Sequence, residues 1–113
     1  MITLLLAFSL TIDFPKIDYK LFKVSQDAQC LLKETSRDRT PEQNKKVGGS
    51  KKSLHLQKNK AVDVVPICEI DYLKLANIAK KYFNGVIIYP DHIHLDLREV
   101  PYFQDNRETL KKK

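Results

Sequence analysis

Two histidines and one aspartate have the types and spacing needed to hold a metal ion. His55 ends the stretch SLH, Asp63 follows eight positions later at the end of AVD, and His94 lies within HIHLDLR. Two imidazole nitrogens and one carboxylate oxygen suit Zn²⁺, which takes three protein ligands in a catalytic site and leaves a fourth position to water. Zinc lowers the pKa of that water to about 7, so the set indicates hydrolysis at neutral pH.

Two further charged residues suit the same chemistry. Asp91 precedes His94 by three positions, at the turn into the same strand, and has the carboxylate needed for a general base and acid. Arg39 suits the neutralisation of charge that develops on a carbonyl oxygen. A single histidine is more often a polar residue with a structural partner, so the prediction rests on the whole set.

The strands that would position these residues are recognised by alternation and by turn residues. AVDVVP predicts a short buried strand closed by Pro66, and VIIY and HIHLDLR predict two strands joined by a tight turn at Pro90-Asp91. Alternation in HIHLDLR divides polar from apolar side chains. One face carries His92, His94, Asp96 and Arg98, and the other carries Ile93, Leu95 and Leu97.

A helix is predicted over residues 69–83, with Asn84-Gly85 as its C-terminal stop. Its apolar stripe consists of Leu75, Ile78, Ala79 and Tyr82. We therefore expect an α+β fold, a small and mostly antiparallel sheet with helices packed on one face. The metal site would lie on the open face, beneath the loop of residues 40–60.

The rest of the chain is less regular. Residues 36–60 have loop chemistry, with one helical turn begun by Thr40 and Pro41. Residues 1–35 are apolar and left undecided, because VSQDAQCLLKE fits either a short helix or a helix running into a strand. We divide the domain into an N-terminal part at 1–35 that fits no clear pattern, a core at 36–98 that carries the candidate site, and a basic C-terminal tail at 99–113.

Composition fits one folded domain with a basic surface. The 113 residues are 42% hydrophobic and 30% charged, which excludes a disordered chain and a membrane protein. The net charge of +6 favours an anionic partner, and eight Lys and Arg lie between Arg37 and Lys60. The run MITLLLAFSL resembles the core of a signal peptide but lacks a preceding basic residue and an A-x-A site. A buried strand or helix is therefore favoured for it. The localisation of the protein stays unknown.

The two cysteines, Cys30 and Cys68, have neither CxxC spacing nor a disulfide-rich context. We expect them to be core or strand residues, as free cysteines commonly are. They would pair only if the fold brought their Cα atoms within about 7 Å.

The ordered motifs resemble a known family, the zinc D-Ala-D-Ala carboxypeptidases and L-Ala-D-Glu endopeptidases of the VanY, VanX and phage-endolysin group. Its signature runs S-G-Y-R, a helical turn with asparagine, V-G-G, S-x-H-x-x-G-x-A-x-D and Y-P-(D/E)-x-x-H-x-D. This chain has SRDR, TPEQN, KVGGSKKSLH, NKAVD and YPDHIHLD in the same order, between Ser36 and Arg98. The resemblance implies a Hedgehog/DD-peptidase-like fold.

The resemblance also implies roles for individual residues. His55, Asp63 and His94 would be the zinc ligands, and Asp91 the catalytic acid and base. Arg39 would contact the substrate carbonyl, Ser53 would shape the ligand loop, and His92 would line the site. Asp96 would be the structural aspartate that follows the last ligand.

The chain departs from the signature at two places. Seven residues separate His55 from Asp63, one more than in the family, and Asn59 replaces the glycine of G-x-A-x-D. Asparagine is the non-glycine residue that best tolerates a left-handed backbone. SRDR also lacks the glycine and tyrosine of S-G-Y-R.

Three hypotheses follow. The first is a zinc peptidase that cuts peptidoglycan stem peptides, acting as a monomer in a phage or bacterial lysis or wall-remodelling role, with no membrane span and no specific nucleic acid. The second is a basic nucleic-acid-binding protein, which only the charge supports. The third is a zinc-binding but inactive relative whose geometry is spoiled by the extra loop residue.

Overall fold

The computed structural model describes residues 16–107, which form a five-stranded sheet with helices. The helical elements are α2 (Lys16–Ala28), α3 (Pro41–Lys46), the 3₁₀ helix η1 (Leu54–Leu56) and α4 (Tyr72–Ala79). The strands are β1 (Leu32–Ser36), β2 (Ala61–Pro66), β3 (Gly85–Ile88), β4 (Ile93–Asp96) and β5 (Tyr102–Asp105). The apolar run MITLLLAFSL lies outside the described residues.

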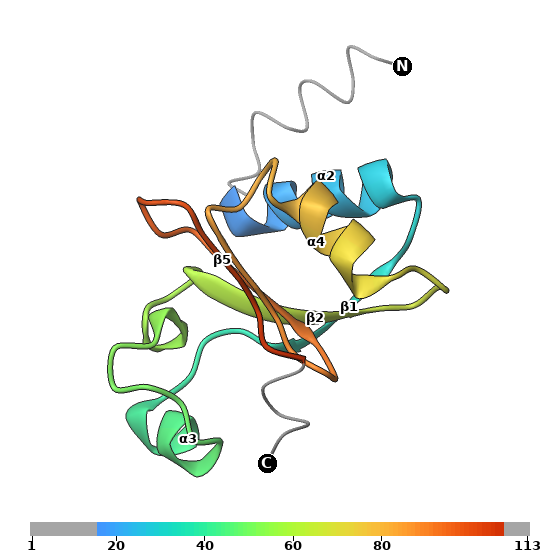
Figure 1. The fold of residues 1–113 in the computed structure, drawn as a ribbon. Coiled ribbons are helices and arrows are strands. Elements are labelled where there is room, and N and C mark those ends of the chain that lie inside the picture. Colours follow the sequence, from blue (N-terminus) through green and yellow to red (C-terminus); the bar gives the residue numbers. More distant parts are fainter. Residues whose placement is uncertain (1–15, 108–113) are drawn as a thin grey trace.

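The sheet has the order β1-β2-β4-β3-β5 and is antiparallel except for the parallel pair β3 and β5. Figure 1 shows α2 and α4 on one face of the sheet, with α3 and its loop away from them beyond the other face. The predicted α+β fold, with a mostly antiparallel sheet and helices on one face, is confirmed. Among residues 16–107 no helix combines the length and the apolar character that crossing a membrane requires.

Alternation along the central strands divides the molecule into a core and a polar face. Val62 and Val64 of β2 and Ile93 and Leu95 of β4 are at most 1% exposed and belong to the core. Residues between them point to the opposite face, because successive side chains of a strand alternate. The faces predicted for HIHLDLR are therefore confirmed.

The helices follow local signals in the sequence. At α3, Thr40 and Gln43 form a capping box and Pro41 is the first helical residue, as predicted. At α4, the side chain of Asp71 accepts hydrogen bonds from Leu73 N and Lys74 N. The predicted apolar stripe packs on the core.

The helix predicted over residues 69–83 is shorter than expected. It covers Tyr72–Ala79, and hydrogen bonds from Tyr82 N and Phe83 N to Ala79 O close a turn after it. Phe83 is 1% exposed and fills the core from this turn. Gly85 is therefore not the stop that we predicted, since it opens β3.

Both ends of the described chain join the sheet, although the first was left undecided and the second was predicted to be a basic tail. VSQDAQCLLKE is a helix running into a strand, with α2 ending at Ala28 and β1 beginning at Leu32. Within the segment 99–113, residues Tyr102–Asp105 form β5 beside β3.

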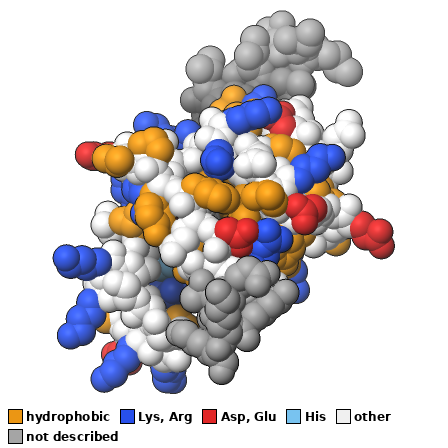
Figure 2. All heavy atoms as spheres, in the orientation of Figure 1, with side chains coloured by type: hydrophobic (Ala, Val, Ile, Leu, Met, Phe, Trp, Pro, Cys, Tyr) orange, Lys and Arg blue, Asp and Glu red, His pale blue; other side chains and the backbone are white. Residues whose placement is uncertain are grey.

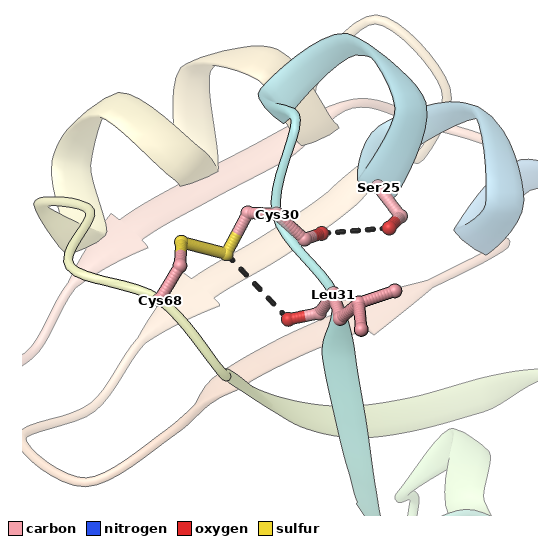
Figure 3. The surroundings of a disulfide bond; sticks show 4 residues. All are labelled: Ser25, Cys30, Leu31 and Cys68. Carbon is pink, nitrogen blue, oxygen red and sulfur yellow. Dashed lines mark hydrogen bonds between the residues drawn. A yellow bond between two sulfur atoms is a disulfide. The ribbon is translucent and has the colours of Figure 1, made fainter.

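The expectation of free cysteines was wrong, because Cys30 and Cys68 form a disulfide, although Cys30 is buried as predicted. Figure 3 shows the bond between the end of α2 and the connection that follows β2. The two Cα atoms are 5.7 Å apart. The cause is the pairing of β1 with β2, in which Leu32 lies opposite Pro66. Cys30 and Cys68 each lie two residues beyond this pair, just outside the two strands, so the pairing brings them together.

Candidate metal centre

Two of the three predicted ligands are neighbours across the sheet. Asp63 of β2 and His94 of β4 are register partners, and their side chains lie on the polar face. Asp63 Oδ1 lies 3.2 Å from His94 Nδ1, and both residues are buried. Antiparallel pairing thus brings together two residues that are 31 positions apart in the sequence.

The third predicted ligand comes from the loop between α3 and β2. Ser53 caps η1 by accepting a hydrogen bond from His55 N at 3.2 Å, which agrees with a loop-shaping role for this serine. His55 is buried, with Nε2 at 3.1 Å from Asp63 Oδ1 and 3.2 Å from His94 Nδ1. Three potential ligand atoms therefore form a nearly equilateral triangle.

The size of this triangle fits a tetrahedral metal ion. Ligand atoms at 2.0–2.1 Å from zinc in a tetrahedral site are about 3.3–3.4 Å from one another. The three donor–donor distances in the structure are 3.1, 3.2 and 3.2 Å. His55, Asp63 and His94 are also the group of described residues able to hold a metal ion together.

Each of the two histidines has an oxygen acceptor on the side of its ring that faces away from the triangle. Nδ1 of His55 faces the backbone oxygen of Arg37 at 2.6 Å, and Nε2 of His94 faces Asp96 Oδ2 at 2.7 Å. Since these oxygens can only accept, the neutral rings carry their hydrogen there and turn a lone pair toward the triangle. Three electron-rich atoms at this separation require a cation or a proton between them.

The same environment changes the pKa of His94. Burial favours the neutral ring, but hydrogen bonds with Asp63 and Asp96 outweigh it and raise the pKa of His94. A proton thus relieves the repulsion that a metal ion would also relieve. The donor chemistry of the site therefore fits a divalent cation.

Asp96 holds the His94 ring in place through its contact with His94 Nε2. Its side chain is fully buried, and Arg98 donates to it from Nε at 2.8 Å and from Nη2 at 2.5 Å. Burial would raise the pKa of Asp96, but hydrogen bonds from Arg98 and His94 outweigh it and hold that pKa well below its usual range. Gly85 lies opposite Asp96 in β3, and any β-carbon there would overlap the carboxylate.

Arg39 lies beside the ligands and contacts Asp63. Its Nη2 donates to Asp63 Oδ2 at 2.9 Å, and its other donors reach Ser36 Oγ at 3.0 Å and Asn44 Oδ1 at 3.3 Å. Burial would raise the pKa of Asp63, but the contacts with the His55 and His94 rings outweigh it and hold the pKa of this carboxyl below its usual range. Arg39 therefore orients the free oxygen of a ligand carboxylate while it also lines the cleft.

Asp91 and His92 line the outer part of the same cleft. The side chain of Asp91 is 85% exposed and bonds His92 Nδ1 at 2.7 Å. His92 stacks on Tyr89, with ring centroids 4.6 Å apart, and its Nε2 is 3.8 Å from Asp63 Oδ2. Asp91 is thus connected to the ligand group through His92.

These residues surround one open cleft of about 1000 Å³. Its walls come from the polar face of the sheet and from the loop that carries η1. The predicted residues on the wall are Arg39, Ser53, His55, Asp63, Asp91, His92 and His94. The fold therefore brings the predicted site residues together in one cleft.

Two arginines near the site were not predicted to have these contacts. Alternation placed Arg98 on the polar face, but its paired contact with Asp96 has no separate signal in the sequence. Arg37 is held by Asp18 and Glu34, and its backbone oxygen contacts His55. That role belongs to the backbone, so residue type does not reveal it.

Comparisons with known proteins agree with this site. The family model for Peptidase M15 matches residues 20–96, a range that contains all three potential ligands. Comparison with curated proteins and with solved structures found no match. Because the family match covers more than half of the chain, the protein belongs to the peptidase M15 family, whose members are metal-dependent peptidases.

Proposed function

We propose that this protein is a zinc peptidase that hydrolyses peptide bonds in peptidoglycan stem peptides, as a carboxypeptidase or as an endolysin-type endopeptidase. One observation carries the proposal, the triangle of lone-pair donors from His55, Asp63 and His94 in an open cleft. Membership of the peptidase family gives this arrangement its reaction class. Zinc is the proposed metal because two imidazoles and a carboxylate suit it.

The roles proposed for the residues combine the family resemblance with their positions in the cleft. Zinc, when bound, supplies Lewis acidity that lowers the pKa of a water molecule to about 7. Asp91 takes up a proton from the attacking water at its exposed carboxylate and returns one to the leaving amine nitrogen. Arg39 keeps Asp63 oriented and brings positive charge to the cleft, where a carbonyl oxygen becomes negative.

The surface around the cleft favours an anionic substrate. Figure 2 shows Lys and Arg side chains gathered over the region of α3 and its loop, where Lys45 and Lys46 lie in the last turn of the helix. Lys52 lines the cleft itself. Stem peptides carry carboxylates and belong to an anionic wall, so this charge suits their approach.

The disulfide supports an action outside the reducing cytoplasm. Disulfides persist in oxidising compartments such as the bacterial periplasm and are rare in the cytosol. The Cys30–Cys68 bond therefore suits a protein that works where peptidoglycan is found. Thiol labelling of the protein extracted under acid, with and without reductant, tests whether the bond is present.

One observation favours a second candidate, a zinc-binding relative without turnover. Asp91 bonds His92 and is largely exposed, whereas a general base must reach the water that it activates. In that case the protein would hold the metal and bind stem peptides without cutting them. The experiment below separates the two.

The test measures zinc per chain and stem-peptide hydrolysis on the same samples, for wild type and Asp63→Ala purified without chelator. We expect about one zinc per wild-type chain, as a three-ligand site holds, and the loss of both zinc and cleavage in the variant. Glu69→Ala, at an exposed position in the connection between β2 and α4, is the control and should retain both.

Each result has a separate meaning. Zinc without cleavage in the wild type would support the inactive relative. A wild type without zinc would contradict the metal site, and salt-sensitive nucleic-acid binding by that metal-free protein would support the basic-surface hypothesis. Mass spectrometry of the products distinguishes release of a terminal D-alanine from cleavage within the stem.

A further inference from the structure

We propose that Arg37, Asp38 and Asn59 form a clamp that fixes the ligand loop and thereby presents His55 to the metal. The proposal rests on the proposed zinc site and adds positioning residues to it. None of the three side chains lines the cleft, so the clamp acts on the metal only through the position of His55.

The loop needs such a support. His55 and Asp63 are separated by seven residues, and Gln57 and Lys58 within this loop are exposed. Surface loops move more than the strands that they connect, whereas a metal ligand must stay within about 0.5 Å of its working position. Something outside η1 must therefore hold the loop in place.

Asn59 is the point at which the loop is held. Its φ is 55°, a left-handed conformation that costs free energy for a residue other than glycine. The side chain of Asp38 accepts a hydrogen bond from Asn59 N at 2.8 Å, and Arg37 Nη1 donates to Asn59 Oδ1 at 3.2 Å. Both the backbone and the side chain of Asn59 are thus bonded to the segment before α3.

His55 is held by that same segment. Its Nδ1 faces the backbone oxygen of Arg37 at 2.6 Å, and its own backbone oxygen accepts from Arg39 N at 2.7 Å. The three residues 37–39 therefore contact the loop at both His55 and Asn59. Between these two contacts lie only residues 56–58, which include the extra position.

The clamp is anchored in the folded body through Arg37. Its guanidinium bonds Asp18 of α2 at 2.6 and 3.2 Å and Glu34 of β1 at 2.6 and 3.2 Å. Only 17% of this side chain is exposed, so the ion pairs are partly shielded from solvent. A helix, a strand and the ligand loop thus meet at one side chain.

These contacts also link the two departures from the family signature noted above. Arg37 and Asp38 occupy the glycine and tyrosine positions of S-G-Y-R, and Asn59 occupies a glycine position in the ligand motif. The departures touch one another, as expected if the changes in SRDR support the longer loop. The extra residue is then accommodated without moving His55 from the triangle.

The experiment measures zinc affinity by competition with a chromogenic chelator and records the visible spectrum of the Co²⁺-substituted protein. We expect Arg37→Ala and Asp38→Ala to weaken zinc binding by about tenfold, the lower end of the range for residues that orient a ligand. The Co²⁺ spectrum should change in both, because the geometry of a ligand changes. Lys58→Ala, in the exposed part of the same loop, is the control and should match the wild type.

Two conservative variants separate positioning from folding. Asp38→Asn keeps an acceptor oxygen for Asn59 N and should restore zinc affinity to within about twofold of wild type. Asn59→Gly tolerates the positive φ and should fold, but it removes the contact with Arg37 and should bind zinc more weakly. The double variant Arg37→Ala/Asn59→Gly should bind zinc no more weakly than Arg37→Ala alone. The reason is that the two single changes remove the same hydrogen bond, between Arg37 and Asn59.

Wild-type zinc affinity and Co²⁺ spectra in Arg37→Ala and Asp38→Ala would overturn the clamp. The clamp would also be overturned if the loss of zinc affinity in the double variant equalled the product of the losses in the two single variants. Either outcome leaves the proposed function intact if the wild type holds zinc and cleaves its substrate. A wild type that holds no zinc overturns the proposed function itself.

Discussion

The strands and the loop contribute to the candidate metal centre in different ways. Asp63 and His94 project from paired strands, and their separation is set by backbone register. His55 projects from a 3₁₀ turn, and its position is set by hydrogen bonds to a distant segment. The strand part therefore depends on the core of the domain, while the loop part depends on a small number of polar contacts.

This difference teaches where each part of the site is vulnerable. Val62, Val64, Ile93 and Leu95 bury the back of the same strands, so a change on the polar face leaves the pairing intact unless it creates a steric conflict. In the loop, removal of one partner frees the backbone locally. Zinc affinity measures both effects on one scale.

The largest effect is expected for His94→Ala, which removes a ligand from the strand part. Zinc affinity should fall by more than about 100-fold, because residues that only orient a ligand already contribute about 10–100-fold. His92→Ala is the matched control, since His92 lies on the same face but outside the triangle. Equal losses of zinc in the two variants would show that His92 is a ligand and that the triangle is wrongly assigned.

Gly85→Ala should break the strand part without touching a ligand. A β-carbon at this position overlaps the Asp96 carboxylate, so Asp96 must move and release Nε2 of His94. We expect zinc affinity to fall by about tenfold or more and the free energy of unfolding by about 1–3 kcal/mol. Chelator competition and urea denaturation measure the two quantities, and unchanged zinc binding would show that Asp96 does not orient His94.

Gly49→Ala should have a smaller effect, which starts in the loop before η1 and reaches Asp63 through Asn44 and Arg39. A β-carbon at Gly49 overlaps the side chain of Asn44, which accepts from Arg39 Nη1 and donates to Ser50 O at 2.8 Å. Because Arg39 reaches Asp63 only through its other nitrogen, we expect a loss of zinc affinity below about tenfold, the lower limit for residues in direct contact with a ligand.

Gly48→Ala is the matched control for this change. Its β-carbon would meet no atom within 4 Å, but its φ is 74°. It should therefore lower the free energy of unfolding by about 1 kcal/mol through backbone strain alone, with zinc affinity unchanged. If both alanine variants bind zinc equally well, Asn44 has no part in holding the site.

The strand part of the site could be predicted from the sequence because its signals are local. Alternation in HIHLDLR divides the core from the polar face, and AVDVVP has too few residues for any other buried element. The cap of α3 is equally local, since Thr40, Pro41 and Gln43 lie within four positions. Each of these predictions needed only neighbouring residues.

The contacts that the sequence did not reveal are between distant segments. LKETS of β1 has no apolar alternation, and its burial is slight, so the strand gives little signal. Without β1 the pairing of Leu32 with Pro66 is unknown, and with it the position of the disulfide. The clamp at Arg37 depends on the same strand.

The smallest effect on zinc is expected for Cys30→Ala/Cys68→Ala, which sharpens the comparison by separating stability from site geometry. The disulfide lies beyond the Leu32–Pro66 pair, whereas Asp63 pairs with Ser36 at the other end of the β1–β2 ladder. Asp63 and Cys68 lie five residues apart, about 17 Å of extended chain, so little strain should pass from one end to the other.

The disulfide joins residues 38 positions apart. Loop-closure entropy for such a separation corresponds to about 4 kcal/mol, and we expect a loss of about 2–4 kcal/mol in the free energy of unfolding. Urea denaturation of the metal-free double variant measures that loss, and chelator competition under folding conditions should give the wild-type zinc affinity. A zinc affinity as weak as that of Gly85→Ala would mean that the ladder transmits strain along its length, so that the metal centre depends on β1 as a whole and not on register alone.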